Sequence, residues 1–444
     1  MMGNILVNQF LSARSSTIPA FLLILIYLFT IGCEDKRVQT VSWFEFEPVY
    51  ISEAEFISSV ELIAPRDLVD PGKIYFYDDF LFVNEINEGV HIIDNSNPAL
   101  PVNVGFINIP ANKDIAVRGT YLYADSNSDL LVFNIQDLNN PQLVSRTEGV
   151  FSNWSEIYLG FPYQRIDPSK GIVVDWKEVK ISETCESNDC YIYNPRFGIW
   201  GTIDFANDRV LFSGSENRSP SVNGTGQGGS MARFAISGDY LYAVDNSDLV
   251  TLDISSFTPS LNNKQNVGWR IETIFPSQGH LFIGSQFAMY IYSIANQTSP
   301  SLTSVYNHLT ACDPVVVQGN YAYVTLRDGS VCQRGVNRLE VIDIQDISNP
   351  REVAFYAMQN PHGLGIDGDY LFVSEGESGI KIMDAIDPLN MKLIRHITDI
   401  KTFDVIPFND VLMVTGATGI VQYDYSDINN IMHLSTIPVT ITAE

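Results

Sequence analysis

The sequence predicts an all-β fold, a β-propeller of four-stranded blades, and two observations lead to it. A strand-like apolar segment with the same ending recurs eight times along the 444 residues, most clearly at residues 339–350. The ending returns about every 41 residues, which is the length of one propeller blade. Between the endings, β-branched and aromatic residues are interrupted by Gly, Asp, Asn and Pro, as in short strands joined by turns.

The units share one order of elements. In the unit at 115–146, a short strand (115–118) precedes an aromatic strand (121–124), and the repeated ending and an Asn-Pro turn lead to a fourth strand (142–146). The aromatic strands are apolar without alternation, which predicts burial on both faces. Sheets stacked radially between two neighbours provide that burial, so we expect each unit to form one blade.

The number of blades follows from the residue at the Asp position of each ending. These residues are Asp94, Asn134, Asp175, Asp253, Ser293, Asp343, Asp384 and Asp424. Their separations are 40, 41, 78, 40, 50, 41 and 40 residues, so two intervals contain insertions. Eight blades are favoured, and seven is the alternative because the third unit, at 171–176, is degenerate. The recurring Asp itself is predicted to be structural, since Asp or Asn entering a turn accepts a hydrogen bond from its own backbone.

Residues 33–444 are predicted to consist of a linker followed by the propeller. The propeller is predicted to cover 65–444, with an inserted loop at 181–229. Residues 33–64 are expected to form a linker to the point of lipid attachment. Within this linker the alternating apolar pattern at 56–63 predicts a strand that pairs with the last blade and closes the ring, because closure hides the edges of the sheets.

Residues 1–32 are predicted to be a signal peptide. Arg14 precedes an apolar run at 20–31, and twelve such residues are too few to span a bilayer comfortably. The Gly-Cys pair that follows resembles the lipobox of bacterial lipoproteins, in which the Cys is acylated. We therefore expect lipidation of Cys33, with the lipid bilayer as a partner and the cell outer membrane as the location. Residues 34–36 resemble acidic export tags, which leaves surface exposure open, and simple secretion or an uncleaved anchor is the alternative.

The charge balance excludes one class of partner. The chain has 26 Lys and Arg against 52 Asp and Glu, a net charge of −26. Such a surface repels phosphate backbones, so nucleic acid is not an expected partner. Basic partners and divalent cations such as Ca²⁺ stay open, and no other cofactor is predicted.

Four cysteines remain when Cys33 is set aside, an even number in an exported chain, and this favours disulfides. The two expected bridges join neighbours in the sequence: Cys185 with Cys190, and Cys312 with Cys332. A metal site is the alternative interpretation, but the only His near either pair is His308.

No catalytic motif stands out. The sequence contains no His-Glu-x-x-His, Gly-x-Ser-x-Gly or Cys-x-x-Cys, and the Gly-rich run 224–229 lacks the Lys of a phosphate-binding loop. Three polar residues are candidates for a ligand site, because each lies just before or within the first strand of a unit: Arg233, Asp313 and His362. Such positions line the channel or one rim of a propeller. The alternative is that Arg233 and Asp313 form a buried structural pair and His362 is an ordinary loop residue.

The Val-Ile-Asp-Ile endings followed by Asn-Pro resemble the repeat named LVIVD, found in exported bacterial proteins. Three further stretches strengthen the resemblance to lipoproteins of this group: 228–234, 312–317 and 360–367. The resemblance covers roughly 50–440 and implies a surface or outer-membrane β-propeller of uncharacterised activity.

Two functions are compatible with these observations. The favoured one is a non-catalytic binding or scaffold propeller at the cell envelope, whose loops at 185–229 and 329–337 meet a protein or glycan ligand. The alternative is an envelope hydrolase or lyase that uses His362 and Asp313 in the channel. Whether the three candidate residues converge should discriminate between them.

Overall fold

We describe the protein from a computed structural model, which defines residues 39–152, 166–185, 214–215, 227–245, 247–308, 314–328 and 336–440. The chain divides into two compact units. The first comprises residues 1–46 and 178–198, and the second comprises residues 47–177 and 199–444. Strands β1 (Gln39–Ile51) and β11 (Ile172–Cys185) pair as a two-stranded sheet.

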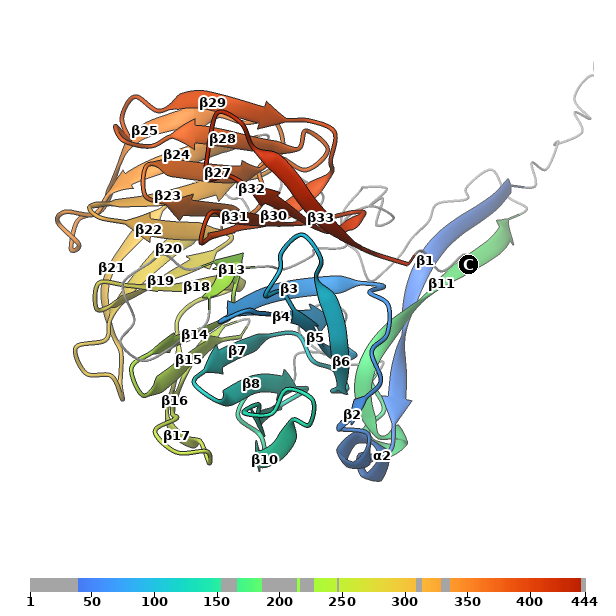
Figure 1. Cartoon of the computed structure of the whole chain (residues 1–444). Coiled ribbons are helices and arrows are strands. Elements are labelled where there is room, and N and C mark those ends of the chain that lie inside the picture. Colours follow the sequence, from blue (N-terminus) through green and yellow to red (C-terminus); the bar gives the residue numbers. More distant parts are fainter. Residues whose placement is uncertain are drawn as a thin grey trace, which may run out of the picture. The chain divides into compact units, whose positions relative to one another are not determined.

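In the described part of the second unit, seven sheets follow one another as blades, each with four antiparallel strands at its centre (Figure 1). We number them along the chain. Blades 1 to 3 contain β3 (Pro71–Tyr77), β4 (Phe80–Glu85), β5 (Gly89–Asp94) and β6 (Val102–Asn108); β7 (Ile115–Arg118), β8 (Tyr121–Ser126), β9 (Asp129–Asn134) and β10 (Gln142–Thr147); and β14 (Phe234–Ser237), β15 (Tyr240–Val244), β16 (Asp248–Asp253) and β17 (Ser260–Asn266).

Blades 4 to 7 repeat this meander. They contain β18 (Ile271–Ser277), β19 (His280–Ser285), β20 (Ala288–Ser293) and β21 (Ser301–Asn307); β22 (Val315–Gln318), β23 (Tyr321–Leu326), β24 (Arg338–Asp343) and β25 (Arg351–Ala357); β26 (Leu364–Asp367), β27 (Tyr370–Ser374), β28 (Ile380–Asp384) and β29 (Lys392–Ile397); and β30 (Thr402–Phe408), β31 (Val411–Gly416), β32 (Gly419–Asp424) and β33 (Met432–Pro438). The four-stranded propeller is confirmed, with seven blades, the alternative count, in the residues that the structure describes.

The third repeat ending does not form a blade. Residues 171–176 lie at the start of β11, whose partner strand is β1, and Asp175 accepts a hydrogen bond from the side-chain amide of Asn87 at 2.7 Å. One strand with a single partner cannot bury both of its faces. The sequence of residues 171–176 matches the repeat, but β11 pairs with β1 alone and lacks the neighbouring strands that would complete a blade.

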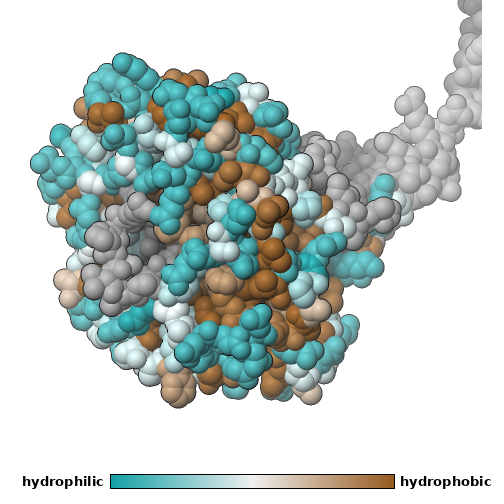
Figure 2. All heavy atoms as spheres, in the orientation of Figure 1, coloured by the Kyte–Doolittle hydropathy of each residue, from teal (hydrophilic) through white to brown (hydrophobic). Residues whose placement is uncertain are grey.

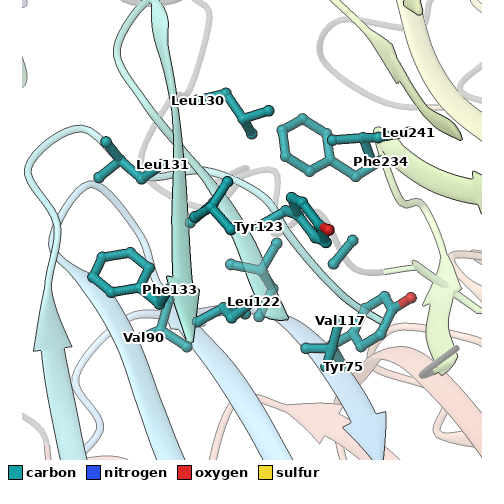
Figure 3. Close-up of a cluster of buried hydrophobic side chains, with 14 of the residues drawn as sticks. Tyr75, Val90, Val117, Leu122, Tyr123, Leu130, Leu131, Phe133, Phe234 and Leu241 are labelled. Carbon is teal, nitrogen blue, oxygen red and sulfur yellow. The ribbon is translucent and has the colours of Figure 1, made fainter. Parts of the chain in front are cut away.

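The core lies between the blades. First strands contact one another from blade to blade, and second strands such as β4 and β8 are buried over nearly their whole length. Figure 3 shows Val90 of blade 1, Leu122 of blade 2 and Leu241 of blade 3 among the side chains that fill these interfaces. Burial of such a side chain contributes about 1.5–3 kcal/mol, so the repeated apolar strands stabilise the ring.

The outer surface also follows the repeat. Figure 2 shows hydrophilic residues over most of the visible surface and apolar residues in smaller patches. Four exposed leucines occupy the second position of a fourth strand: Leu143, Leu261, Leu302 and Leu393. A repeated side chain on the outermost strand has no neighbouring blade to cover it, which explains its exposure.

The predicted structural role of the recurring Asp is confirmed. The side chain at this position accepts a hydrogen bond from the backbone N–H two residues on in every blade, at 2.8–3.3 Å. Hydrogen bonds from the hydroxyls of Ser96, Ser255 and Ser426, followed by those from the backbone N–H of the same residues, hold the pKa values of Asp94, Asp253 and Asp424 below the ordinary value. The Asp therefore ends the third strand and starts the turn that follows.

The prediction that residues 56–63 form a strand that closes the ring is wrong. Helix α2 (Glu53–Ser58) takes up the first part of this segment, and β2 (Glu61–Ile63) pairs with β6 at the outer edge of blade 1. Blades 7 and 1 meet instead through apolar side chains, among them Ile74 and Met413. A parallel bridge between Leu68 and Val439 lies beside this contact. Side-chain packing and this bridge thus join the two blades without a strand shared between them.

Several predicted residues lie outside the described part of the chain. They are Cys33, Cys190, Cys312, Asp313 and Cys332, whereas Cys185 is the last residue of β11. In the described ranges, no helix has the length and apolar composition needed to cross a membrane.

Candidate functional site

One end of the propeller gathers the beginnings of the first strands. Each blade is an antiparallel meander, so its first strand begins at the end where its second strand finishes. Backbone bonds confirm the register: Asp125 N–H donates to the carbonyl of Asp114, and His362 N–H donates to that of Ser374. We call this end the start face. It carries the candidates Arg233, before β14, and His362, before β26.

Residues 227–232 form a hub segment at the middle of the ring. Strand β13 (Gln227–Ser230) adds to the inner edge of blade 1 beside β3 and pairs on its other side with β12 (Gly214–Ser215). It also contacts β18, β26 and β30, and Figure 1 shows it beside β18 and β3. The hub segment therefore connects innermost strands from different sides of the ring.

Hydrogen bonds attach the hub segment to three blades. The hydroxyl of Ser230 accepts from Leu364 N–H at 2.9 Å and donates to Asp404 Oδ1 at 3.2 Å, in blades 6 and 7. The carbonyl of Ala232 accepts from Ile274 N–H of blade 4 at 2.8 Å. Ser230 is only 2% exposed, so these bonds are shielded from water. The Gly-rich run predicted to be a loop thus ends in a paired strand, of which Gly229 and Ser230 are buried.

Arg233 belongs to a group of charged residues that we call the lysine cluster: Lys73, Lys113, Asp114, Asp125 and Arg233. Lys73 Nζ forms an ion pair with Asp114 Oδ2, and both side chains are buried. The same oxygen of Asp114 accepts hydrogen bonds from the backbone N–H of Arg233 at 2.6 Å and of Phe234 at 3.0 Å. Asp114 therefore joins blades 1, 2 and 3.

The second acid of the lysine cluster shapes the chain before blade 2. Asp125 Oδ1 accepts from the backbone N–H of Lys113 and of Asp114, each at 2.8 Å, and from Asn112 Nδ2 at 2.8 Å. In blade 6, Glu375 accepts from the backbone N–H of Gln359 and Asn360 in the same way. An acid at the end of the second strand thus fixes the chain that leads into the first strand.

Burial shifts the pKa values of the lysine cluster. Desolvation lowers the pKa of Lys73 to about 8, although Asp114 opposes the shift, and Arg233 lowers it further. Desolvation also lowers the pKa of Lys113 to about 8, with Asp125 opposing. The pKa of Asp125 is raised to about 6 because its carboxyl is buried. Three cations and two acids in one place make this a structural charge network.

His362 lies in a different group. Its charged neighbours are Arg327 and Lys401, whereas those of Lys73 include Arg233. Burial, followed by the two cations, lowers the pKa of His362 well below its ordinary value, so the imidazole is neutral at pH 7. Arg233 thus contributes to the lysine cluster, whereas the charged neighbours of His362 are Arg327 and Lys401, and Asp313 lies outside the described residues.

Sequence reasoning missed the members of the lysine cluster other than Arg233. A usable signal was present, since Lys113 and Asp114 directly precede the first strand of blade 2, as Arg233 precedes that of blade 3. Within the described ranges, no three His, Cys, Asp or Glu side chains gather as a metal-binding group.

Comparison with known proteins identifies the repeat. The LVIVD repeat model matches residues 72–108, 111–148, 228–265 and 310–357, which lie in blades 1, 2, 3 and 5. No curated protein matches the chain.

Two solved structures with a TM-score of 0.50 support the fold. The computationally designed Ika8 protein has a TM-score of 0.50 at 8% identity, covering 86% of this chain and 92% of that chain. A protein from Lactobacillus plantarum has a TM-score of 0.50 at 11% identity, covering 84% and 97%. BamB from Moraxella catarrhalis has a TM-score of 0.48 at 9% identity, covering 87% and 99%. The chain therefore contains LVIVD repeats, matched in four blades of its β-propeller.

Proposed function

We propose that the protein is an exported, outer-membrane lipoprotein that binds a protein or glycan at the cell envelope and catalyses no reaction inside its ring. The lipid anchor is supported by the sequence alone: Arg14, the apolar run 20–31 and the Gly-Cys pair before residue 34 have the arrangement of a lipoprotein signal. A propeller held on a membrane by acyl chains presents a rigid face to its surroundings.

The observation that carries the binding role is the position of the hub segment. Its contacts with β3, β18, β26 and β30 occupy the middle of the ring, where a channel enzyme would hold its substrate. A ligand would then meet the start face and the loops around it.

The anchor can be tested by metabolic labelling. Full-length protein expressed in a Gram-negative host with an alkyne-tagged fatty acid should take up the label and be recovered in the outer-membrane fraction. Cys33→Ala should take up no label and leave that fraction, because the thiol that accepts the acyl chain is gone.

Cys185→Ala is the matched control, since it removes a cysteine far from the signal and should keep the label. Equal labelling of the Cys33→Ala variant, or an unlabelled wild-type protein in the soluble fraction, would contradict the anchor.

A further inference from the structure

Exposed apolar side chains gather at the end of the propeller opposite the start face. Each third strand finishes at this end, where a turn leads to the fourth strand. In blades 1, 6 and 7 we call the segment from the recurring Asp to the second residue of the fourth strand the turn rim: residues 94–103, 384–393 and 424–433. Six of its side chains are large, apolar and 46–72% exposed: Leu100, Val102, Ile386, Leu389, Leu393 and Met432.

The other blades present fewer such side chains at this end. In the corresponding segments of blades 2 to 5, the exposed large apolar residues are Leu143, Phe257, Leu261 and Leu302. Six such side chains on three blades thus compare with four on four blades. Blades 6, 7 and 1 are also consecutive, because blades 7 and 1 meet through their apolar side chains. Single exposed apolar residues are ordinary, whereas several on neighbouring blades mark a surface that a partner covers.

Hydrogen bonds between blades hold the turn rim in place. Asn95 of blade 1 and Gln422 of blade 7 are buried and bond reciprocally through their side chains, at 3.0 and 2.7 Å. Arg395 Nη1 of blade 6 donates to the carbonyl of Asn429 in the turn of blade 7 at 3.0 Å. The three segments are therefore linked from blade 6 through blade 7 to blade 1, so little conformational freedom would be lost when a partner binds.

The turn rim is acidic. Its three segments contain five Asp and one Lys, Lys392, and so carry a formal charge of −4 with His neutral. The turns between the first and second strands of the same blades lie at the same end and add four exposed acids without a Lys or Arg: Asp78, Asp79, Asp369 and Asp410. The corresponding segment of blade 4, 293–302, contains the exposed Leu302 but no charged residue.

The combination of aliphatic and acidic groups indicates the kind of partner. Aliphatic side chains gain free energy when apolar groups of a protein cover them. Sugar hydroxyls placed against them would lose water without gaining hydrogen bonds. The charge of the turn rim repels the anionic headgroups of a bilayer and attracts Lys and Arg.

We infer that the turn rim is a docking surface for a partner protein whose contact surface is apolar and basic. The six exposed side chains supply the apolar area, and the acids around them select a partner of opposite charge. The turn rim lies opposite the start face, so this inference adds a second surface to the proposed binding function and holds whether or not the start face binds a ligand.

Fluorescence anisotropy with two labelled peptides tests the inference, one of alternating Leu and Lys and one of alternating Leu and Glu. The full-length protein is held in phosphatidylcholine nanodiscs, so that no detergent competes for apolar surface. The Leu-Lys peptide should bind saturably and at least about tenfold more tightly than the Leu-Glu peptide, because the acids oppose the second. Absence of saturable binding, or equal affinity for the two peptides, would overturn the inference.

Two leucines at equivalent positions locate the binding surface. Leu393 and Leu302 are the second residues of β29 and β21 and are 52% and 53% exposed, so serine at either position should leave the melting temperature unchanged. Leu393→Ser should weaken binding of the Leu-Lys peptide about tenfold, as expected when an interface loses an aliphatic side chain. Leu302→Ser should leave binding unchanged, because its segment lacks acids. Equal weakening by both variants would show that the turn rim is not the docking surface.

Asp387→Asn separates the charge of the turn rim from its shape. Asp387 Oδ1 accepts from Leu389 N–H at 3.1 Å, and an amide oxygen at the same place can keep this bond. The variant should bind the Leu-Lys peptide up to about fivefold more weakly and with a smaller dependence on salt. Unchanged affinity and salt dependence would contradict the role of the acids in selecting the partner.

A bilayer is the other occupant that the experiment must address. The Cys33→Ala protein and the same protein with Leu393→Ser should sediment equally with phosphatidylglycerol vesicles, because the acids repel this surface. Better sedimentation of the protein that keeps Leu393 would assign the turn rim to the membrane and overturn the inference. Fatty-acid labelling of Cys33 does not depend on these results, so the lipid anchor is tested separately.

Discussion

Two ion pairs of the propeller, Lys73 with Asp114 and Lys401 with Glu377, differ in the exposure of their acids. In the lysine cluster, Lys73 pairs with Asp114, whose side chain is 1% exposed and also accepts two backbone hydrogen bonds. Lys401, which precedes β30, pairs with Glu377, whose side chain is 74% exposed. A buried acid that also binds the backbone commits its cation to the fold, whereas solvent screens a pair with an exposed acid and leaves it weak.

Removal of the buried acid should have the largest effect. Asp114→Ala leaves Lys73 buried without its partner, and we expect a loss of about 3–5 kcal/mol in the free energy of unfolding. Urea denaturation followed by fluorescence measures this loss.

Glu377→Ala is the matched change in the exposed pair with Lys401, and it should cost at most about 1 kcal/mol because solvent screens the pair. If both variants lose the same stability, the contrast between the two ion pairs does not hold.

The hub segment gives an intermediate effect. Ser230→Ala removes the hydroxyl that joins blades 6 and 7 and leaves the buried Leu364 N–H without an acceptor, at a cost of about 1–3 kcal/mol. Thermal unfolding detects the change, with Ser299→Ala at an exposed turn as the control. A Ser230→Ala variant as stable as this control would show that the hub segment does not hold the blades together.

The smallest effect at neutral pH is expected for Asp125→Asn, because an amide oxygen can still accept the three hydrogen bonds of Oδ1. Burial raises the pKa of Asp125 from 3.8 to about 6, so the folded state binds this proton more tightly than the unfolded state. The stabilisation from that proton is fully present below pH 3.8 and is lost as the pH rises through about 6.

The stability of the wild type relative to Asp125→Asn should therefore increase as the pH falls from about 6 to about 4. Urea denaturation of both proteins at several pH values measures this difference. A difference that stays constant over the range would show that Asp125 has an ordinary pKa in the folded protein.

Turns and buried strands could be predicted where they depend only on residues close together in the sequence. The recurring Asp bonds a backbone N–H two residues away, so a turn at Asp343 or Asp424 needs no distant partner. The buried second strands were predictable for a similar reason, because runs such as 121–124 are apolar without alternation. Arg233 and His362 were correctly placed near strand starts, since that position follows from the repeat.

Distant pairings could not be predicted. Asp114 accepts from the backbone of Arg233 across 119 positions, and Ser230 bonds to Asp404 across 174. Residues 56–63 alternate as a strand should, but part of the segment forms α2 and the rest pairs with blade 1. Periodicity tells which face of a segment is apolar and does not tell which surface will cover it.

The sequence by itself determined the β-propeller and the turn that ends each third strand, because strand burial and Asp turns depend on patterns within one blade. Only the tertiary structure decided the number of blades, the manner of ring closure and the grouping of charges at the start face. These depend on which edges and ionic groups meet across the ring, and the free energy of such contacts comes from burial and pairing that no local pattern contains.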